Sequence, residues 1–305
     1  MKLIFAGTPA NAAQALRLLS QRHEITLVIT REDAVSGRKQ ELKPSAVAEA
    51  ANELGLPVLK RNRLTADDLS EIRQSGAELA VVVAYGALVP PALLEEIPWW
   101  NLHFSLLPKW RGATPLQHSM LSGGEGSGVT LFELEAGLDT GPIIASESID
   151  IDFSKTCGDL LTEFTSRGIE ITESALASRP LAAPQSGKAS YAPKISRQEA
   201  RLDLSEVASK LHHKVMALNP EPMAWLELDG SPLRILRTAS VGDTNWDSLD
   251  EVHFTPGAVS SGAGKVWLHC ARGTRLELLE VQPAGKKPMR AADWFRGLNR
   301  EVRLD

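Results

Sequence analysis

The sequence contains little cysteine and no long hydrophobic run. Cys157 and Cys270 are far apart, and neither has the spacing of a metal-binding cluster. Two isolated thiols are typical of a reducing compartment. The apolar opening, residues 1–6, ends at Gly7 and is too short for a signal peptide or a membrane span. We therefore expect a cytoplasmic protein that binds neither a membrane nor a metal ion.

The chain also lacks an excess of positive charge and a dinucleotide-binding fingerprint. Its formal net charge of −5 argues against a uniformly basic nucleic-acid binder, so any contact with nucleic acid must come from local patches. Gly7 is the only glycine before Gly37, so the G-x-G-x-x-G spacing is missing after the first predicted strand. Gly7-Thr8-Pro9 is instead interpreted as a plain turn from a strand to a helix.

The chain does have enough apolar sequence for two cores. It has 305 residues, of which 43% are hydrophobic and 23% charged, and this length suits two domains. Up to about residue 180, strands without polar alternation are interleaved with helices, which indicates a mostly parallel sheet covered on both faces. We predict a doubly wound α/β domain over residues 1–180, where ligands bind beyond the carboxyl ends of the strands.

The elements of this first domain are predicted from hydrophobic periodicity and helix-capping signals. Strands are predicted at residues 2–6, 23–30, 57–60, 79–84, 101–105, 129–134 and 143–151, and helices at 10–19, 44–54, 65–76, 91–97, 115–121 and 154–178. The polar stretch at residues 31–43 shows no periodicity, so we expect a long loop there.

The pattern changes after residue 180. Residues 181–203 are rich in proline, alanine and glycine at their start and are predicted to be a linker. One helix at 205–217 is followed by short alternating runs that are separated by turn signals such as Asp229-Gly230. We predict that residues 204–305 form a small antiparallel β-barrel.

An amide, an imidazole and a carboxylate stand in the two most informative segments. Asn101 and His103 are two residues apart in a predicted strand, so their side chains should point to the same side. Asp139 lies in Gly137-Leu-Asp-Thr-Gly141, where the glycines allow a ligand to approach closely. Alone, such a histidine is more often structural, and such an aspartate often caps a turn. Together, at strand ends of one domain, the three predict attack of a nucleophile on an acyl carbon.

Each of these side chains suits one part of such a reaction. Asn101 and protonated His103 can donate to an oxygen that gains negative charge, and one such donor is typically worth about 3–4 kcal/mol. We expect Asp139 to raise the pKa of His103 and to favour its charged form. His103 would then protonate the leaving group, and Asp139 or a water that it holds would accept the proton of the nucleophile. The division of acid and base between the two is a hypothesis.

Basic residues gather in three segments of this acidic chain: the first long loop, the linker and a stretch near the C-terminus. A run of charge is usually only a solvated face. Three such segments nevertheless predict one footprint for a polyanion. The residues expected to make it are Arg38, Lys39, Lys43, Lys194, Arg197, Lys286 and Lys287.

The polar trio belongs to longer strings that point to a family. Asn101-Leu-His-Phe-Ser-Leu-Leu-Pro108 with Gly137–Gly141 resembles the tetrahydrofolate-dependent formyltransferases. Other strings extend the resemblance over both predicted domains: Phe5-Ala-Gly-Thr-Pro9, Val82-Val-Ala-Tyr-Gly86, Tyr191-Ala-Pro-Lys-Ile-Ser196, Asn219-Pro-Glu-Pro222 and Gln282-Pro-Ala-Gly-Lys-Lys287. The resemblance implies a Rossmann-like catalytic domain followed by an OB-like barrel that binds tRNA.

The resemblance also implies substrates and residue roles. The co-substrate would be 10-formyltetrahydrofolate, and the acceptor would be the α-amino group of methionine esterified to initiator tRNA. The family's catalytic residues fall on Asn101, His103 and Asp139, and its folate-binding residues on Ser105, Leu106, Leu107, Pro108, Tyr85 and Gly86. We expect a monomer whose basic segments contact the tRNA.

Other functions stay open at this point. The same chemistry could act on a different amine, such as a nucleotide sugar or glycinamide ribonucleotide, although the complete second domain argues against this. A hydrolase would instead pass the formyl group to water. A catalytically silent RNA-binding module would not need Asn101, His103 and Asp139, so their presence argues against that class.

Overall fold

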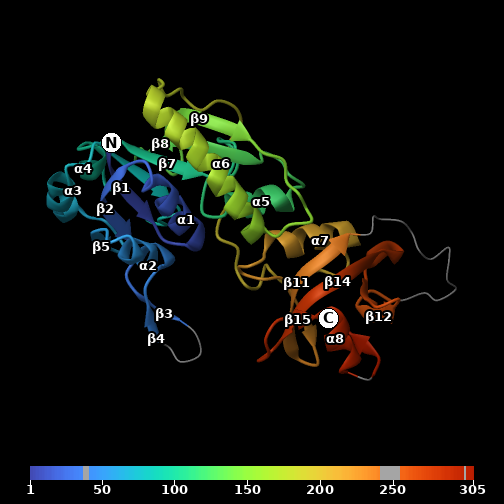
Figure 1. The fold of residues 1–305 in the computed structure, drawn as a ribbon. Helices are drawn as coiled ribbons and strands as arrows, with labels where there is room; N and C mark the ends of the chain where they lie inside the picture. The colour runs from blue at the N-terminus through green and yellow to red at the C-terminus, as the bar shows by residue number, and fades with distance from the viewer. Residues whose placement is uncertain (37–40, 241–254, 299) are drawn as a thin grey trace. The chain divides into compact units, whose positions relative to one another are not determined.

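The computed structural model describes residues 1–36, 41–240, 255–298 and 300–305 (Figure 1). The chain divides into two compact units. Unit 1 comprises Met1–Pro115, Gly126–Asp150 and Leu161–Pro193, and unit 2 comprises Leu116–Glu125, Ile151–Leu160 and Lys194–Asp305. Within the described ranges, no helix is both long and apolar enough to cross a membrane.

Unit 1 is built on a seven-stranded sheet in the order β5-β2-β1-β6-β7-β8-β9. The five strands from β5 to β7 in this order run parallel to one another. Strand β8 pairs antiparallel with β7, and β9 pairs antiparallel with β8. Their bounds are β1 Lys2–Gly7, β2 Glu24–Thr30, β5 Val58–Lys60, β6 Leu79–Val83, β7 Trp99–His103, β8 Gly128–Glu133 and β9 Ile143–Ser148. The predicted mostly parallel sheet is therefore confirmed.

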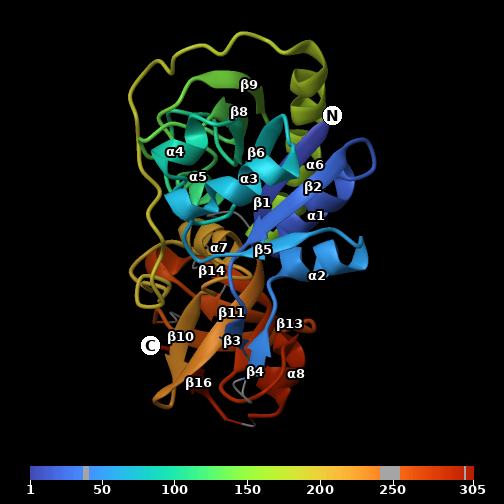
Figure 2. The same cartoon turned by 90° about the vertical axis from the view of Figure 1, so that its left-hand side faces the viewer.

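Helices cover both faces of this sheet (Figure 2). Gln14 of α1 donates to Ser166 of α6 over 3.0 Å, and Leu102 of β7 packs against Gly168 of α6. On the other face, α3 and α4 contribute Ile72 and Leu93 to the core. The bounds are α1 Ala10–Leu19, α2 Ala46–Glu53, α3 Leu69–Ser75, α4 Pro91–Leu94 and α6 Cys157–Ser178, with a short 3-10 turn, η1, at Ala66–Asp68. Helix α5, Pro115–Leu121, belongs to unit 2 from its second residue on.

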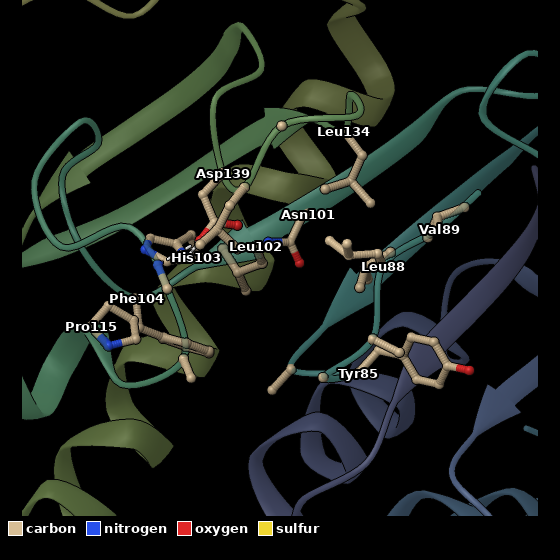
Figure 3. A pocket seen from close by; sticks show the side chains of 18 of the residues that line it. Tyr85, Leu88, Val89, Asn101, Leu102, His103, Phe104, Pro115, Leu134 and Asp139 are labelled. Carbon is tan, nitrogen blue, oxygen red and sulfur yellow. Dashed lines mark hydrogen bonds and ion pairs between the residues drawn. The ribbon is translucent and has the colours of Figure 1, made fainter. Parts of the chain in front are cut away.

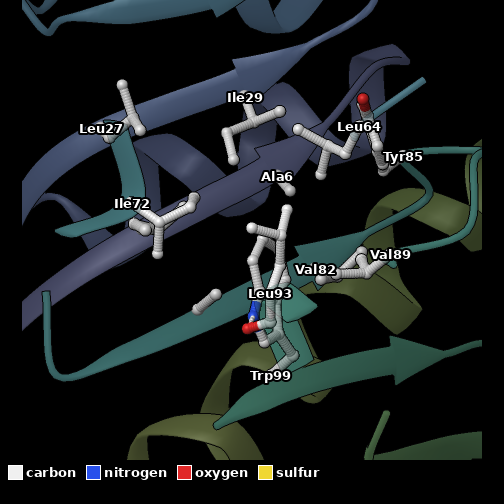
Figure 4. Close-up of a cluster of buried hydrophobic side chains, with 12 residues drawn as sticks. Ala6, Leu27, Ile29, Leu64, Ile72, Val82, Tyr85, Val89, Leu93 and Trp99 are labelled. Carbon is white, nitrogen blue, oxygen red and sulfur yellow. Dashed lines mark hydrogen bonds between the residues drawn. The ribbon is translucent and has the colours of Figure 1, made fainter. Parts of the chain in front are cut away.

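The core on the α3–α4 face determines where β7 lies (Figure 4). Alternate residues of the central strands, such as Ile4 and Val82, point into it. Trp99, the first residue of β7, is buried in the same cluster, and its indole Nε1 donates to the Leu93 carbonyl over 2.9 Å. Burying a large aromatic side chain stabilises a fold strongly, so Trp99 anchors the strand that carries Asn101 and His103.

The predicted loop at residues 31–43 contains a hairpin. β3 (Ala34–Ser36) and β4 (Glu41–Lys43) pair antiparallel, with Val35 opposite Leu42. Each strand is three residues long and has one central apolar residue beside charged or small ones. This is too short for a period of two to be recognised, which is why the hairpin was missed.

Two acidic residues before the hairpin are engaged by neighbours within unit 1. Lys60 Nζ lies 2.5 Å from Asp33 Oδ1, and Asn62 donates to Glu32 over 2.8 Å. These contacts tie the start of the hairpin to the end of β5 and the residues after it.

Unit 2 is built on an antiparallel sheet in the order β10-β11-β14-β13-β12-β16, with β15 paired to β14. Glu227 of β10 and Asp305 exchange two backbone hydrogen bonds of 2.7 and 3.0 Å, which join the first strand to the residues after the last one. The sheet thus closes on itself, and the predicted small barrel is confirmed. The bounds are α7 Ala208–Ala217, β10 Trp225–Leu228, β11 Ser231–Ser240, β12 Ala258–Gly262, β13 Lys265–His269, η3 Ala271–Gly273, β14 Arg275–Pro283, β15 Met289–Arg290, α8 Ala291–Arg296 and β16 Val302–Arg303.

Candidate active site

A cavity of about 530 Å³ opens beside the carboxyl ends of β6 and β7 in unit 1 (Figure 3). Doubly wound folds bind ligands at this edge, and the volume lies in the usual range for small-molecule sites, about 300–1,000 Å³. The wall consists of Pro9, Val82, residues 84–89, residues 101–104, Gly112, Ala113, Pro115, Leu134, Glu135 and residues 137–139.

Strand β7 carries Asn101 and His103 into this cavity. Both lie on the side of the strand that begins with the buried Trp99, because side chains alternate along a strand. Val82 of β6 pairs with Asn101 and lines both the core and the cavity, so the site continues the hydrophobic core. The expectation that Asn101 and His103 share one side is confirmed.

The ring of His103 is fixed through one nitrogen. Nε2 lies 2.9 Å from the carbonyl oxygen of Trp110. A carbonyl oxygen can only accept, so Nε2 carries a proton and donates it. In the neutral ring Nδ1 then has no proton, and it faces the Asp139 carboxylate at 3.9 Å. This separation is too long for a hydrogen bond.

Asp139 reaches the cavity from the loop between the antiparallel strands β8 and β9. Its φ is +50°, an uncommon value for a residue other than glycine. Its Oδ2 accepts from the backbone N–H of Gly112 over 2.7 Å. A Cβ on Gly141 would lie 1.8 Å from the carbonyl oxygen of Glu133, so the base of this loop is closed too tightly for any side chain there.

The electrostatics of His103 differ from the prediction. Burial lowers the pKa of His103, although the Asp139 carboxylate and the Trp110 carbonyl act in the opposite direction. The side chain of His103 is 5% exposed. Asp139 thus acts on the pKa of His103 in the predicted direction, but the predicted net rise is wrong because burial outweighs it. The sequence indicated the charged partner but not the extent of burial. A pKa below the ordinary histidine value favours the neutral imidazole near pH 7.

The remaining wall of the cavity is mostly apolar. Leu88 and Val89 come from the loop after β6, and Leu134 comes from the loop that carries Asp139 (Figure 3). Leu138 of the same loop also lines the cavity. Leu88 and Leu138 are 67% and 53% exposed, which is a large apolar surface to leave in water beside a cavity. We did not predict these leucines, although the apolar run directly after the strand at residues 79–84 was a signal for the first of them.

Tyr85 and Gly86, predicted to bind the co-substrate, line the cavity. The Tyr85 hydroxyl turns away from it and donates to the Arg61 carbonyl over 2.7 Å. Burial raises the pKa of Tyr85 to about 12. The Gly86 carbonyl accepts from the Arg31 guanidinium. The two residues therefore contribute the shape of the wall more than free polar groups.

The predicted folate-binding residues Ser105, Leu106, Leu107 and Pro108 are not among the residues that line the cavity. The Ser105 hydroxyl donates to the Lys109 carbonyl over 2.7 Å, and the Leu107 N–H donates to the Thr130 hydroxyl over 3.2 Å. This turn packs against β8 directly after His103 and supports the end of β7. Its role in folate binding stays a prediction.

The residues predicted to contact tRNA are distributed over both units. Lys43 lies on β4, Lys194 and Arg197 lie at the start of the long unit 2 segment, and Lys286 and Lys287 lie in the turn after β14; all five are exposed. Arg38 and Lys39 lie outside the described residues. Among the residues that are described, no group of three or more His, Cys, Asp or Glu is arranged to hold a metal ion.

Comparison with known families identifies the class of protein. The formyl transferase family model matches residues 1–176, and the model of the formyl transferase C-terminal domain matches residues 194–299. The chain therefore belongs to the formyl transferase family and is an enzyme.

Individual relatives narrow this class to methionyl-tRNA formyltransferases. That of Leifsonia xyli subsp. xyli is 42% identical, and the similarity covers 100% of both chains. The solved methionyl-tRNA formyltransferase from Clostridium thermocellum shares the fold, with a TM-score of 0.61 over 80% of this chain and 95% of that chain, at 16% identity. HypX from Aquifex aeolicus, solved in complex with tetrahydrofolic acid, matches with a TM-score of 0.66 over 100% of this chain and 48% of its own, also at 16% identity.

Proposed function

We propose that this enzyme transfers the formyl group of 10-formyltetrahydrofolate to the α-amino group of methionine esterified to initiator tRNA. The observation that carries the proposal is that Asn101, His103 and Asp139 line one cavity whose remaining wall is mostly apolar. The full-length similarity to methionyl-tRNA formyltransferases supports the choice of acceptor.

The cavity suits a folate. Leu88, Val89 and Leu138 would contact a flat heteroaromatic ring, and backbone groups of the two loops would meet its polar edge. The folate supplies an activated formyl carbon. We propose that Tyr85 and Gly86 hold it as parts of the wall, and that the turn from Ser105 to Pro108 keeps β7 in place behind it.

Asn101 is proposed to stabilise the negative charge that develops on the formyl oxygen during attack. Its side chain lies between the His103–Asp139 pair and the leucine-lined part of the cavity (Figure 3). An amide N–H aimed at this oxygen from a rigid strand needs no reorganisation during the reaction.

Neutral His103 is proposed to act first as a base. An α-amino group next to an ester is a weak base, so much of it is uncharged near neutral pH and can attack the formyl carbon. The unprotonated Nδ1 of His103 accepts the proton that the amine loses during this attack. The Asp139 carboxylate and the Trp110 carbonyl then stabilise the imidazolium. His103 finally donates this proton from Nδ1 to the leaving nitrogen of the folate. This order replaces our expectation that Asp139 is the base.

The basic residues of the two units are proposed to contact the tRNA. Neutralising phosphates releases counterions, so the affinity for tRNA should fall steeply as salt rises, despite the net negative charge of the protein. Replacing Lys286 and Lys287 by glutamine should reduce the slope of log affinity against log salt by about 1 for each phosphate that is no longer neutralised. An unchanged slope would remove these two lysines from the interface.

The direct test is a formyl-transfer assay with 10-formyltetrahydrofolate and four acceptors: methionyl initiator tRNA, methionyl elongator tRNA, glycinamide ribonucleotide and water alone. Transfer confined to the initiator supports the proposal. Transfer to the small amine alone would keep the chemistry and overturn the choice of acceptor. Binding of tRNA without any transfer would overturn the enzymatic mechanism.

A further inference from the structure

The segment Ala183–Pro193, which ends unit 1, contacts both loops of the site. Ala183 and Ile143 exchange two backbone hydrogen bonds of 2.7 and 2.8 Å just beyond the Asp139 loop. Farther along, Arg111 donates its backbone N–H to Ser190 over 2.9 Å. The segment therefore connects the loop that carries Asp139 with the loop that carries Trp110 and Gly112.

Two side chains of this segment contact the site loops: the Ser190 hydroxyl accepts from the Trp110 N–H over 3.0 Å, and Gln185 makes the contacts to the Asp139 loop. Its Nε2 donates to the carbonyl oxygens of Asp139, over 2.9 Å, and Gly141, over 2.8 Å. Its Oε1 accepts from the Arg111 guanidinium, at 2.7 Å from Nη2 and 3.3 Å from Nε. Two carbonyls can only accept and a guanidinium can only donate, so the amide has one possible orientation.

Asp139 is consequently held at its carboxylate by one neighbour and at its main-chain carbonyl by another. Gly112 binds its carboxylate Oδ2, and Arg111 orients the glutamine that binds its main-chain carbonyl. The left-handed backbone of Asp139 costs free energy, so it persists only where the surroundings hold it in place. The Gln185 amide supplies that hold from outside the cavity wall.

We infer that Gln185 is a positioning residue for formyl transfer, which keeps the Asp139 carboxylate opposite Nδ1 of His103. The inference rests on the proposed function for its kinetic consequence. Gln185 is not among the residues that line the cavity, so it acts through Asp139 and not on a substrate. Displacing a reacting or charge-stabilising group by about 1 Å can cost about 100-fold in rate.

The first test replaces Gln185 by methionine, which has a similar length but cannot make these hydrogen bonds. We expect kcat to fall about 10- to 100-fold, with the KM for each substrate changed less than about twofold. Gln185→Glu should be at least as impaired, because Arg111 would keep the carboxylate ionised and facing two carbonyl oxygens. Ser186→Ala, on the exposed neighbouring residue, is the matched control and should keep the wild-type kcat.

A second measurement separates positioning from loss of stability and does not need activity. Titration of isotope-labelled His103 by NMR should give a lower pKa in Gln185→Met than in the wild type, because the carboxylate that favours the imidazolium has moved away. An unchanged His103 titration, or a loss of kcat that only parallels a fall in Tm, would overturn the inference. If the wild type transfers formyl to none of the tested amines, the proposed function fails, and the titration still decides the role of Gln185.

Discussion

Each unit of this enzyme buries a histidine, and the two rings are held differently. His103 in unit 1 is bonded through Nε2, and its Nδ1 faces a carboxylate at 3.9 Å across the cavity wall. His212 on α7 in unit 2 uses both nitrogens: Nδ1 lies 2.8 Å from the Thr238 hydroxyl, and Nε2 donates to the Phe153 carbonyl over 2.9 Å. Burial lowers the pKa of both rings.

Burial and a lowered pKa therefore do not distinguish the histidine that we propose to be reactive from a structural one. The neutral ring of His212 is satisfied on both sides, since Thr238 can donate to Nδ1 while Nε2 donates to a carbonyl. Of these two rings, only that of His103 can take up a proton without rearranging an existing hydrogen bond. The difference lies in one nitrogen that is directed at the cavity.

Replacing His103 should have the largest effect. We expect His103→Asn to lower kcat by about 10²–10⁴-fold, the usual contribution of a general acid–base group. His212→Asn, the matched change in unit 2, should keep kcat within a few-fold. Single-turnover formyl transfer with saturating substrates measures both, and near-normal turnover of His103→Asn would refute its assignment.

Asn101 should come second, because its proposed role is to stabilise charge without moving a proton. Asn101→Ala is expected to lower kcat by about 10²–10³-fold, or about 3–4 kcal/mol, with little change in the KM for folate. The pH at which the rate is half-maximal should stay where it is in the wild type, since His103 is intact. A variant with raised KM and normal kcat would show that Asn101 binds the ground state only.

His212 should matter for stability and not for rate. His212→Phe leaves the Thr238 hydroxyl and the Phe153 carbonyl without their partner, so the free energy of unfolding should fall by about 1–3 kcal/mol. Denaturant titration measures this change, and kcat serves as the control. A large loss of kcat at unchanged stability would mean that the two histidines are not as different as their hydrogen bonds indicate.

The smallest effect should be on the pH dependence of stability. For both histidines the pKa in the folded chain is lower than in the unfolded chain, so the unfolded chain binds more protons between the two values. The free energy of unfolding should thus decrease as the pH falls below about 6.5, the ordinary histidine value. His212→Phe should flatten part of this decrease in Tm measured from pH 8 to 5. Parallel curves for the two proteins would contradict the lowered pKa of His212.

The sequence could predict which side of a strand a residue faces, because this depends only on alternation. Asn101 and His103 were placed correctly on that ground. Asp139 was predicted as a site residue from its glycine-rich motif. That it would reach the cavity from a loop between two antiparallel strands could not be predicted, since strand direction depends on pairing with distant residues. The same holds for Gln185, whose partners are 44, 46 and 74 positions away in the chain.

Properties that depend on packing could not be predicted from the sequence. The sign of the His103 pKa shift is set by how much protein surrounds the ring, and local spacing does not contain this. The turn from Ser105 to Pro108 was predicted to bind folate, which stays a prediction, but its hydrogen bonds to Lys109 and Thr130, which direct it against β8, could not be foreseen. Nothing in the local sequence distinguished Leu88 and Leu138 from other apolar residues, because only the fold brings both to the same cavity.

The two exposed leucines also set the thermodynamic character of binding. A ligand that covers Leu88 and Leu138 removes apolar surface from water, and burial of such surface gives a negative change in heat capacity. The enthalpy of binding should therefore become more favourable with rising temperature, while the affinity changes far less. Calorimetry should therefore distinguish ligand binding over these two leucines, with its negative change in heat capacity, from the salt-dependent association expected of a polyanion.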